Sequence, residues 1–251
     1  MSDTNSKVGK PVSFSLDGKT VEAQPGETIW QAAARHGTDI PHLCYRDSDG
    51  YRADGNCRAC MVEIEGERVL AASCIRTPTE GMVVHSENHR ARTARKMVME
   101  LLVADQPSRD TAHDPDSELW RYAETQDVDA ARFPAKASPA PDSSHPAIAV
   151  NMDACIQCNL CVRACREVQV NDVIGLAGRG ADAHIVFDFG DDMGASTCVG
   201  CGECVQACPT GALMPKTLLD DSQALAITPD RQVDSVCPYC GVGCQLTFSV
   251  K

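Results

Sequence analysis

Cysteine dominates the chemistry that this chain could perform. Fifteen of its 251 residues are cysteines, and they fall into three groups separated by long cysteine-free stretches. Thiolates are the preferred ligands of zinc and of iron–sulfur clusters, and C-x-x-C spacing brings two of them to one metal site. Because disulfides are rare in a reducing cytosol, this spacing favours metal binding over disulfide bonding.

The first group is suited to a [2Fe–2S] cluster. It has the spacing C-x12-C-x2-C-x13-C and consists of Cys44, Cys57, Cys60 and Cys74. A [2Fe–2S] core needs four thiolates, two for each iron. Gly50 and Gly55 allow the intervening loop to wrap closely around such a core. Structural zinc is the alternative, but it prefers two C-x-x-C pairs, and this group has only one.

The second group is an approximate internal repeat. The segments CIQCNLCVRAC and CVGCGECVQAC both have the spacing C-x2-C-x2-C-x3-C. This run resembles the two-cluster bacterial ferredoxins, in which the last cysteine of each run ligates the other cluster. The resemblance implies two [4Fe–4S] clusters, one held by Cys155, Cys158, Cys161 and Cys208, the other by Cys198, Cys201, Cys204 and Cys165.

One departure from the small ferredoxins lies between the two runs. Arg166 follows Cys165 where proline is usual, and 32 residues separate Cys165 from Cys198. Large oxidoreductases insert a strand or hairpin at this point. Gly175, Gly178 and Gly180 fall inside the insertion, and we interpret them as a turn between strands because no G-x-G-x-x-G opens a helix there.

The third group is incomplete. Cys237, Cys240 and Cys244 in CPYCGVGC have the spacing C-x2-C-x3-C. This motif resembles the start of the molybdopterin-oxidoreductase domain, where a fourth cysteine further on completes a [4Fe–4S] cluster. We expect a possible third [4Fe–4S] cluster to need a ligand beyond residue 251, and we favour a truncated chain. A ligand from another chain, an incomplete cluster and three idle cysteines are the alternatives.

The elements that must position these cysteines are short. Residues 11–24 predict a β-hairpin around Asp17-Gly18, and residues 25–37 predict a helix that ends at Gly37. Strand-like runs between residues 61 and 87 complete a β-β-α-β-β order. Residues 88–104 predict a helix that packs through Met97 with Leu101 and Val98 with Leu102, and residues 105–146 predict a linker or irregular surface segment.

Charge and composition exclude several classes of function. The formal net charge is −12, so DNA would be repelled and nucleic acid is not expected as a partner. No apolar run approaches the ~20 residues that span a bilayer, and the N-terminus carries no export signal, so we expect no membrane span and a cytoplasmic location. Only 4% of the residues are aromatic, which suggests that clusters replace part of the hydrophobic core.

The segment IPHLCYRDSDGYRADGNCRACMVEIEG resembles a known domain. It is similar to the β-grasp [2Fe–2S] ferredoxin domain of complex I large subunits, iron-only hydrogenases and NAD-dependent formate dehydrogenases, over residues 11–87. The three cysteine groups in order resemble the N-terminal region of the alpha, or catalytic, subunit of cytoplasmic NAD-dependent molybdenum or tungsten formate dehydrogenases. The resemblance implies an α+β fold with a β-grasp [2Fe–2S] domain, a helix and linker, a bacterial-ferredoxin-like 2×[4Fe–4S] domain and the start of a molybdopterin-oxidoreductase domain. We place these parts at residues 1–87, 88–146, 147–220 and 221–251.

One cluster of those families is expected to be missing. They carry a histidine and three cysteines, spaced H-x3-C-x2-C-x5-C, just after the corresponding helix. Here the four positions hold Gln106, Asp110, His113 and Leu119, and no cysteine lies between Cys74 and Cys155. We interpret His113 as a surface residue, along with His85 and His89.

The resemblance implies that these 251 residues transfer electrons and that catalysis takes place elsewhere in the enzyme. Electrons would pass along the clusters between a molybdopterin site in the remaining catalytic domain, where formate and CO2 interconvert, and a flavin- and NAD-binding diaphorase-type subunit with a small iron–sulfur subunit. No residue here stands out as an acid, base or nucleophile. The alternatives are a stand-alone electron-transfer subunit of an NAD-linked hydrogenase or other dehydrogenase, an iron-only hydrogenase, and a multi-zinc scaffold.

Overall fold

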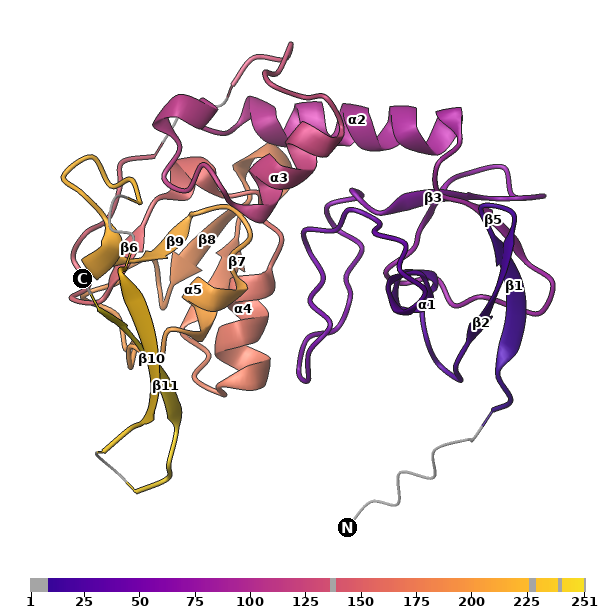
Figure 1. Cartoon of the computed structure of the whole chain (residues 1–251). Helices are drawn as coiled ribbons and strands as arrows, with labels where there is room; N and C mark the ends of the chain where they lie inside the picture. Colours follow the sequence, from indigo (N-terminus) through magenta and orange to yellow (C-terminus); the bar gives the residue numbers. More distant parts are fainter. Residues whose placement is uncertain (1–8, 136–138, 226–228, 239–240, 251) are drawn as a thin grey trace.

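Two folded bodies and one long helix account for most of the chain. The computed structural model describes residues 9–135, 139–225, 229–238 and 241–250. The N-terminal body and the body that begins near residue 148 lie next to each other. The 16-residue helix α2 (His89–Ala104) runs across both of them (Figure 1). A hairpin near the C-terminus projects away from the second body.

The N-terminal body is a mixed sheet with one helix against it. Its five strands are ordered β2-β1-β5-β3-β4. Their bounds are β1 Val12–Leu16, β2 Lys19–Ala23, β3 Met61–Ile64, β4 Ala71–Ala72 and β5 Val83–His85. Strands β1 and β2 form the expected hairpin, with Asp17 at φ 49° and Gly18 at φ 80°, and β1 runs parallel to β5. The sheet has one strand more than the order predicted from the sequence.

The helix of this body, α1 (Ile29–Arg35), begins at a capping box. The Gln31 backbone N–H donates to Thr28 Oγ1 at 3.2 Å, and the Thr28 N–H donates to Gln31 Oε1 at 3.0 Å. The helix ends before Gly37, whose φ is 77°, as the sequence predicts. Its buried face contributes Ile29 and Ala33 to a core that also contains Phe14 and Val62 from the sheet.

The contacts of α2 differ from the prediction. Met97 and Leu101 are 45% and 52% exposed, so this predicted pair points to solvent, whereas Leu102 of the other predicted pair packs against the core. The buried face carries Arg95 and Met99 instead. Arg95 is fully buried because its guanidinium donates to the Ser86 carbonyl and to Glu87 Oε1, which joins the helix to the end of the sheet. The spacing of apolar residues could not predict this face of α2, because the face is centred on an arginine whose charge is paired.

Part of the predicted linker belongs to the core. Residues 118–125 form helix α3 (Glu118–Thr125), and the Leu119 N–H donates to the Pro209 carbonyl at 3.2 Å. Leu119, Trp120 and Ala123 are buried in the same hydrophobic cluster as several cysteines of the second body. The prediction of a surface segment is therefore wrong for this helix. A short 3-10 turn, η1 (Arg109–Thr111), precedes it.

The second body contains little regular structure. Strands β6 (Ile148–Val150) and β9 (Leu213–Pro215) pair antiparallel, and β7 (Ile174–Ala177) pairs with β8 (His184–Phe187) as the hairpin expected between the two cysteine runs. The other elements are η2 Met152–Ala154, α4 Leu160–Arg163, η3 Ala164–Val168, η4 Gly180–Asp182, α5 Glu203–Ala207 and η5 Lys216–Leu218. Gly178 and Gly180 lie between β7 and β8, as interpreted from the sequence.

The projecting hairpin consists of β10 (Arg231–Val236) and β11 (Gln245–Val250), paired antiparallel over their full length. Its side chains are mostly exposed, including Val233, Val236 and Phe248. Among the described residues, no helix is both long enough and apolar enough to cross a bilayer.

Candidate metal centres

The four cysteines of the first group meet where the loop between α1 and β3, which carries Cys44, Cys57 and Cys60, approaches the turn after β4, which carries Cys74. All four are buried, and their thiols hydrogen-bond to one another in the series Cys57–Cys44–Cys74–Cys60. The Cys57 backbone N–H also donates to Cys44 Sγ at 3.4 Å. The structure therefore gathers all four predicted ligands in one place.

The electrostatics of these four buried thiols favour a bound cation. Hydrogen bonds from the Cys57 and Cys74 thiols lower the pKa of Cys44 to about 2, while the same contacts raise the pKa values of Cys57 and Cys74 well above the ordinary range. One thiolate is thus stabilised at the expense of its neighbours. Four buried thiolates become compatible only when a positively charged centre offsets their repulsion, which the irons of a [2Fe–2S] core would do.

The loop that carries Cys57 depends on one glycine. Gly55 has φ 64°, and a Cβ atom there would lie 3.1 Å from Cδ1 of Ile75. Arg58, directly after Cys57, also adopts a positive φ of 59°. The turn thereby presents Cys57 and Cys60 inward, which agrees with the close wrapping predicted for this loop.

Eight cysteines of the second body line two neighbouring cavities, and the division follows the crossed pattern. The first cavity, with about 330 Å³ of empty space, is lined by Cys155, Cys158, Cys161 and Cys208. The second, with about 310 Å³, is lined by Cys165, Cys198, Cys201 and Cys204. The last cysteine of each run therefore belongs to the cavity of the other run. The remaining walls are largely apolar, with Ile156, Ala212 and Leu213 at the first cavity and Ile148 and Ile174 at the second.

The backbone of the two runs is conformationally equivalent. The second residue after the leading cysteine is left-handed in both, as Gln157 with φ 55° and Gly200 with φ 67°. The fourth residue is left-handed too, as Asn159 with φ 66° and Gly202 with φ 78°. In the first run two non-glycine residues thus adopt the left-handed conformation that glycines adopt in the second run. Because this conformation is unfavourable for non-glycine residues, the surrounding structure must enforce the turn.

Backbone amides point at the cysteine sulfurs of both cavities. The Gln157 N–H donates to Cys155 Sγ at 3.4 Å, the Val173 N–H to Cys165 Sγ at 3.3 Å, and the Gly200 N–H to Cys198 Sγ at 3.4 Å. Such bonds favour thiolate sulfur and adjust the potential of a bound cluster. Burial raises the pKa of Cys204 to about 12 and also raises the pKa values of Cys158 and Cys161 well above the ordinary thiol range, so these thiols ionise readily only with a metal beside them.

The eight cysteines of the second body surround two cavities, four to each, and four thiolates are the donor set of a [4Fe–4S] core. Donor chemistry and shape therefore both fit iron–sulfur clusters.

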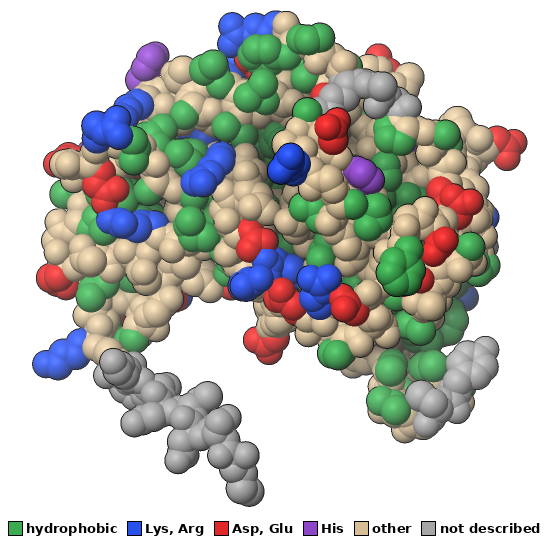
Figure 2. Space-filling view, turned by 180° about the vertical axis from the view of Figure 1, so that it is seen from behind, with side chains coloured by type: hydrophobic (Ala, Val, Ile, Leu, Met, Phe, Trp, Pro, Cys, Tyr) green, Lys and Arg blue, Asp and Glu red, His purple; other side chains and the backbone are tan. Residues whose placement is uncertain are grey.

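The [2Fe–2S] loop lies against the second body through a set of polar contacts that we call the seam. The Tyr51 hydroxyl donates to Glu203 Oε1 at 2.8 Å, and Arg46 Nη1 donates to the Gln206 carbonyl at 2.6 Å. Arg163 forms an ion pair with Asp54 across the same boundary. Figure 2 shows basic and acidic side chains beside one another where the two lobes meet.

The seam brings the cysteine groups close together. Cys44 and Cys57 share one hydrophobic cluster with Cys158 and Cys161. Burial is the main cause of the raised pKa of Cys158, and the negative charge of Cys44 contributes to it as well. None of the seam residues was singled out from the sequence. Only the charge of Arg163 within CVRAC and of Asp54 within YRADGNC could have drawn attention to them.

The third group lies on the projecting hairpin. Cys237 follows β10 and Cys244 precedes β11, and the Cys237 N–H donates to the Cys244 carbonyl at 2.8 Å. Cys244 is exposed and Cys237 is partly buried. Cys240 lies outside the described residues. The hairpin thus brings two of these three cysteines together at the end where its two strands are connected.

The four positions of the expected missing cluster have other roles in this structure. Leu119 is fully buried in the core, and Asp110 is exposed on η1. The side-chain amide of Gln106 is buried without a hydrogen-bond partner. His113 is only 8% exposed, so its interpretation as a surface residue is wrong: Nε2 contacts Asp153 Oδ1 at 3.0 Å and Nδ1 contacts the Gln223 carbonyl. His89 is exposed, as interpreted, and His85 pairs with Glu65 at the surface.

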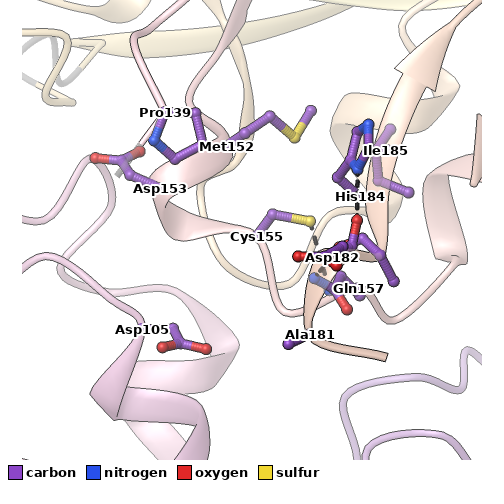
Figure 3. Close-up of a pocket in the computed structure, with 11 residues that line it drawn as sticks. Asp105, Pro139, Met152, Asp153, Cys155, Gln157, Ala181, Asp182, His184 and Ile185 are labelled. Atoms are coloured by element: carbon purple, nitrogen blue, oxygen red, sulfur yellow. Dashed lines mark hydrogen bonds between the residues drawn. The ribbon is translucent and has the colours of Figure 1, made fainter. Parts of the chain in front are cut away.

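A solvent pocket of about 660 Å³ opens beside the first cavity. It extends from Asp105 at the end of α2 to Asp182 and His184 near β8, and Cys155 lies in its wall (Figure 3). Met152 and Ile185 line both this pocket and the first cysteine cavity. Cys155 thus lies in the walls of both the solvent pocket and the first cavity.

The pair of His113 and Asp153 predicts a pH dependence. The hydrogen bond that His113 donates to the Asp153 carboxylate raises the pKa of His113 above its ordinary 6.5. The stabilisation it gives is therefore complete below pH 6.5 and is lost as pH rises through the folded-state pKa. We expect His113→Gln to speed hydrogen exchange of the segment at Leu225, whose N–H donates to the His113 carbonyl, more at pH 6 than at pH 8.5.

The matched control for that experiment is His85→Gln, because His85 pairs with Glu65 at the surface. It should leave exchange at Leu225 unchanged at both pH values. Equal effects of His113→Gln at the two pH values would contradict the assignment of a charged histidine.

Comparison with known families agrees with the three cysteine groups. Residues 9–89 match the family described as a 2Fe-2S iron–sulfur cluster binding domain. Residues 154–212 match the 4Fe-4S dicluster domain. Residues 230–251 match the molybdopterin oxidoreductase Fe4S4 domain.

Similar proteins include subunits of several nicotinamide-linked enzymes. The NADP-reducing hydrogenase subunit HndD of Solidesulfovibrio fructosivorans is 34% identical over 88% of this chain and 39% of its own length. An NADH-quinone oxidoreductase subunit of Rhizobium meliloti is 32% identical over 96% of this chain and 28% of its own length. The chain thus spans well under half of either relative.

A solved structure is similar over a larger share of its length. A chain in the crystal structure of an NAD⁺-reducing [NiFe]-hydrogenase in the H2-reduced state superposes with a TM-score of 0.72 at 28% identity. The match covers 82% of this chain and 87% of that chain.

Proposed function

This chain carries a 2Fe-2S ferredoxin domain, a 4Fe-4S dicluster domain and the start of a molybdopterin oxidoreductase domain, and we propose that it conducts electrons within a nicotinamide-linked oxidoreductase. The observation that carries this proposal is the division of eight cysteines between two adjacent cavities, with the buried Cys44 group held against them by the seam. Iron–sulfur clusters supply one-electron redox chemistry, and the protein supplies their position, burial and hydrogen bonds.

The proposed ligand sets are those expected from spacing. Cys44, Cys57, Cys60 and Cys74 would hold one [2Fe–2S] cluster, and the two cavities would each hold one [4Fe–4S] cluster. The burial of the thiols would keep water from the clusters, and the backbone N–H groups of Gln157, Val173 and Gly200 donate hydrogen bonds to cysteine sulfurs. Residues 9–89 and 154–212 would form two cluster-binding domains joined by α2.

Two versions of the larger assembly follow from different observations. The similar proteins are subunits of an NADP-reducing hydrogenase and of an NADH-quinone oxidoreductase, which favours a subunit that exchanges electrons with a flavin- and NAD-binding partner. The match of residues 230–251 to the molybdopterin oxidoreductase domain favours a chain that continues toward a molybdopterin site, as in a formate dehydrogenase alpha subunit. Formate-dependent reduction of a viologen dye by the full-length protein, compared with H2-dependent reduction, would separate them.

Cys57→Ala is expected to remove the [2Fe–2S] cluster selectively. Because Cys57 lies in the first group and outside both cavities, the variant should lose the [2Fe–2S] electron paramagnetic resonance signal and keep the signals of the cubanes. Iron analysis should fall from about 10 to about 8 per chain, leaving aside the third group. Simultaneous loss of all signals would contradict separate sites, and a colourless, redox-silent wild-type protein would refute the proposed function.

A further inference from the structure

The two cysteine cavities differ in their access to the surface. Cys155 and Cys208 of the first cavity are partly buried, and Cys158 and Cys161 are buried. The second cavity contains Cys201, an exposed cysteine in a cavity wall. A cluster in the second cavity would therefore come nearest to the molecular surface at Cys201.

Three large apolar side chains near the second cavity are exposed. Val170 and Val199 are 81% and 67% exposed, and Phe189 is fully exposed. Val199 lines the second cavity itself, and Val170 precedes Asn171, which lines it too. Phe189 follows Asp188, whose carboxylate accepts hydrogen bonds from Thr197 just before Cys198. We call Val170, Phe189 and Val199 the collar.

Acidic residues flank the collar. Asp191 and Asp192 are exposed two and three positions after Phe189. Figure 2 shows apolar and acidic side chains next to one another on the side of the molecule that holds the second body. The seam contacts the second cysteine run through Glu203 and Gln206. Val170, Phe189 and Val199 are exposed with the [2Fe–2S] domain in place, so that domain leaves the collar uncovered.

We propose that the collar around Cys201 is the docking surface for a one-electron carrier protein whose contact face is apolar at its centre and basic at its rim. An exposed apolar group beside a redox ligand marks a site of transient association, and the aspartates select a basic rim by charge complementarity. Each encounter moves one electron between the cluster held by Cys201 and the carrier, with no bond made or broken. This inference rests on the proposed function, since it requires a cluster in the second cavity.

Cytochrome c, a small basic one-electron haem protein, is the probe for this surface. Calorimetric titration of the oxidised, cluster-loaded protein measures binding without electron transfer, and stopped-flow mixing of the reduced protein measures the second-order rate constant. We expect Val170→Lys/Val199→Lys to weaken binding and slow the reaction by about tenfold or more. Wild-type rates should fall as salt concentration rises.

Two further variants make the test specific. Asp191→Lys/Asp192→Lys should slow the reaction and flatten its salt dependence without altering the apolar collar. Leu101→Lys on α2 is the matched control, because Leu101 is similarly apolar and 52% exposed, and it should behave as wild type.

The outcomes separate this inference from the proposed function. Iron analysis and paramagnetic resonance on every sample show whether the clusters are present. If they are absent from the wild type, the proposed function fails. If they are present and the collar and rim variants match the Leu101→Lys control in both binding and rate, or if the wild type neither binds nor reduces cytochrome c, the docking surface is refuted.

Discussion

Removing the clusters from the intact chain should unfold the second body and spare the first. Between residues 148 and 215 the strands are three or four residues long and α4 has four residues, so few backbone hydrogen bonds hold this part together. Its centre is two cavities lined by eight thiols. We expect metal binding to supply most of its folding free energy, as in other small metal-stapled domains.

The N-terminal sheet provides the internal control for that experiment. It has five strands and a core of its own built from Phe14, Ile29, Val62 and Val84. After iron is removed by a chelator under reducing conditions, hydrogen exchange should accelerate by at least about a hundredfold across residues 148–215, while β1 and β2 remain protected. Equal protection of the second body with and without iron would show that the polypeptide alone determines its fold.

Breaking the ion pair between Asp54 and Arg163 should loosen the two bodies from each other. The Arg163 side chain is 5% exposed, and its remaining partner after loss of Asp54 is Glu167 at 3.1 Å. A buried charge that loses a partner costs about 3 kcal/mol or more, and Glu167 offsets part of that cost, so we expect about 2 kcal/mol for Asp54→Ala. Hydrogen exchange in residues 43–57 should rise by one to two orders of magnitude.

Two controls separate this effect from general destabilisation. Asp172→Ala removes the partner of Arg166 in a pair that is exposed on both sides, and it should cost less than about 0.5 kcal/mol. The double variant Asp54→Ala/Arg163→Met also removes the buried charge that has lost Asp54, and it should recover part of the lost protection. No difference between Asp54→Ala and Asp172→Ala would mean that the seam does not hold the [2Fe–2S] loop.

Local signals in the sequence were sufficient for several parts of the fold. Asp17 and Gly18 adopt the left-handed pair that their hairpin turn requires, and Thr28 caps the helix that ends before Gly37. In both of these cases neighbouring residues determine the conformation. The crossed division of the cysteine runs between two cavities was expected only from the resemblance to two-cluster ferredoxins, because it joins residues as far apart as Cys155 and Cys208.

Features that depend on distant contacts were missed. The apolar pairs on α2 predicted a packing face through Met97, but the helix turns Arg95 inward because Ser86 and Glu87 satisfy its guanidinium. Trp120 lies in a polar segment, yet it is buried because α3 packs beside the second body. His113 is buried because Asp153, forty residues away in the chain, pairs with it.

The division of each cysteine run between both cavities restricts how the protein can be assembled. During synthesis the first cavity lacks its fourth cysteine until Cys208 has left the ribosome. The second cavity has only Cys165 until the second run, which begins at Cys198, has been synthesised. Neither half of the repeat can mature alone. Loading of either cavity fixes one cysteine of the other in place, so cluster insertion should be cooperative and should follow completion of the whole segment.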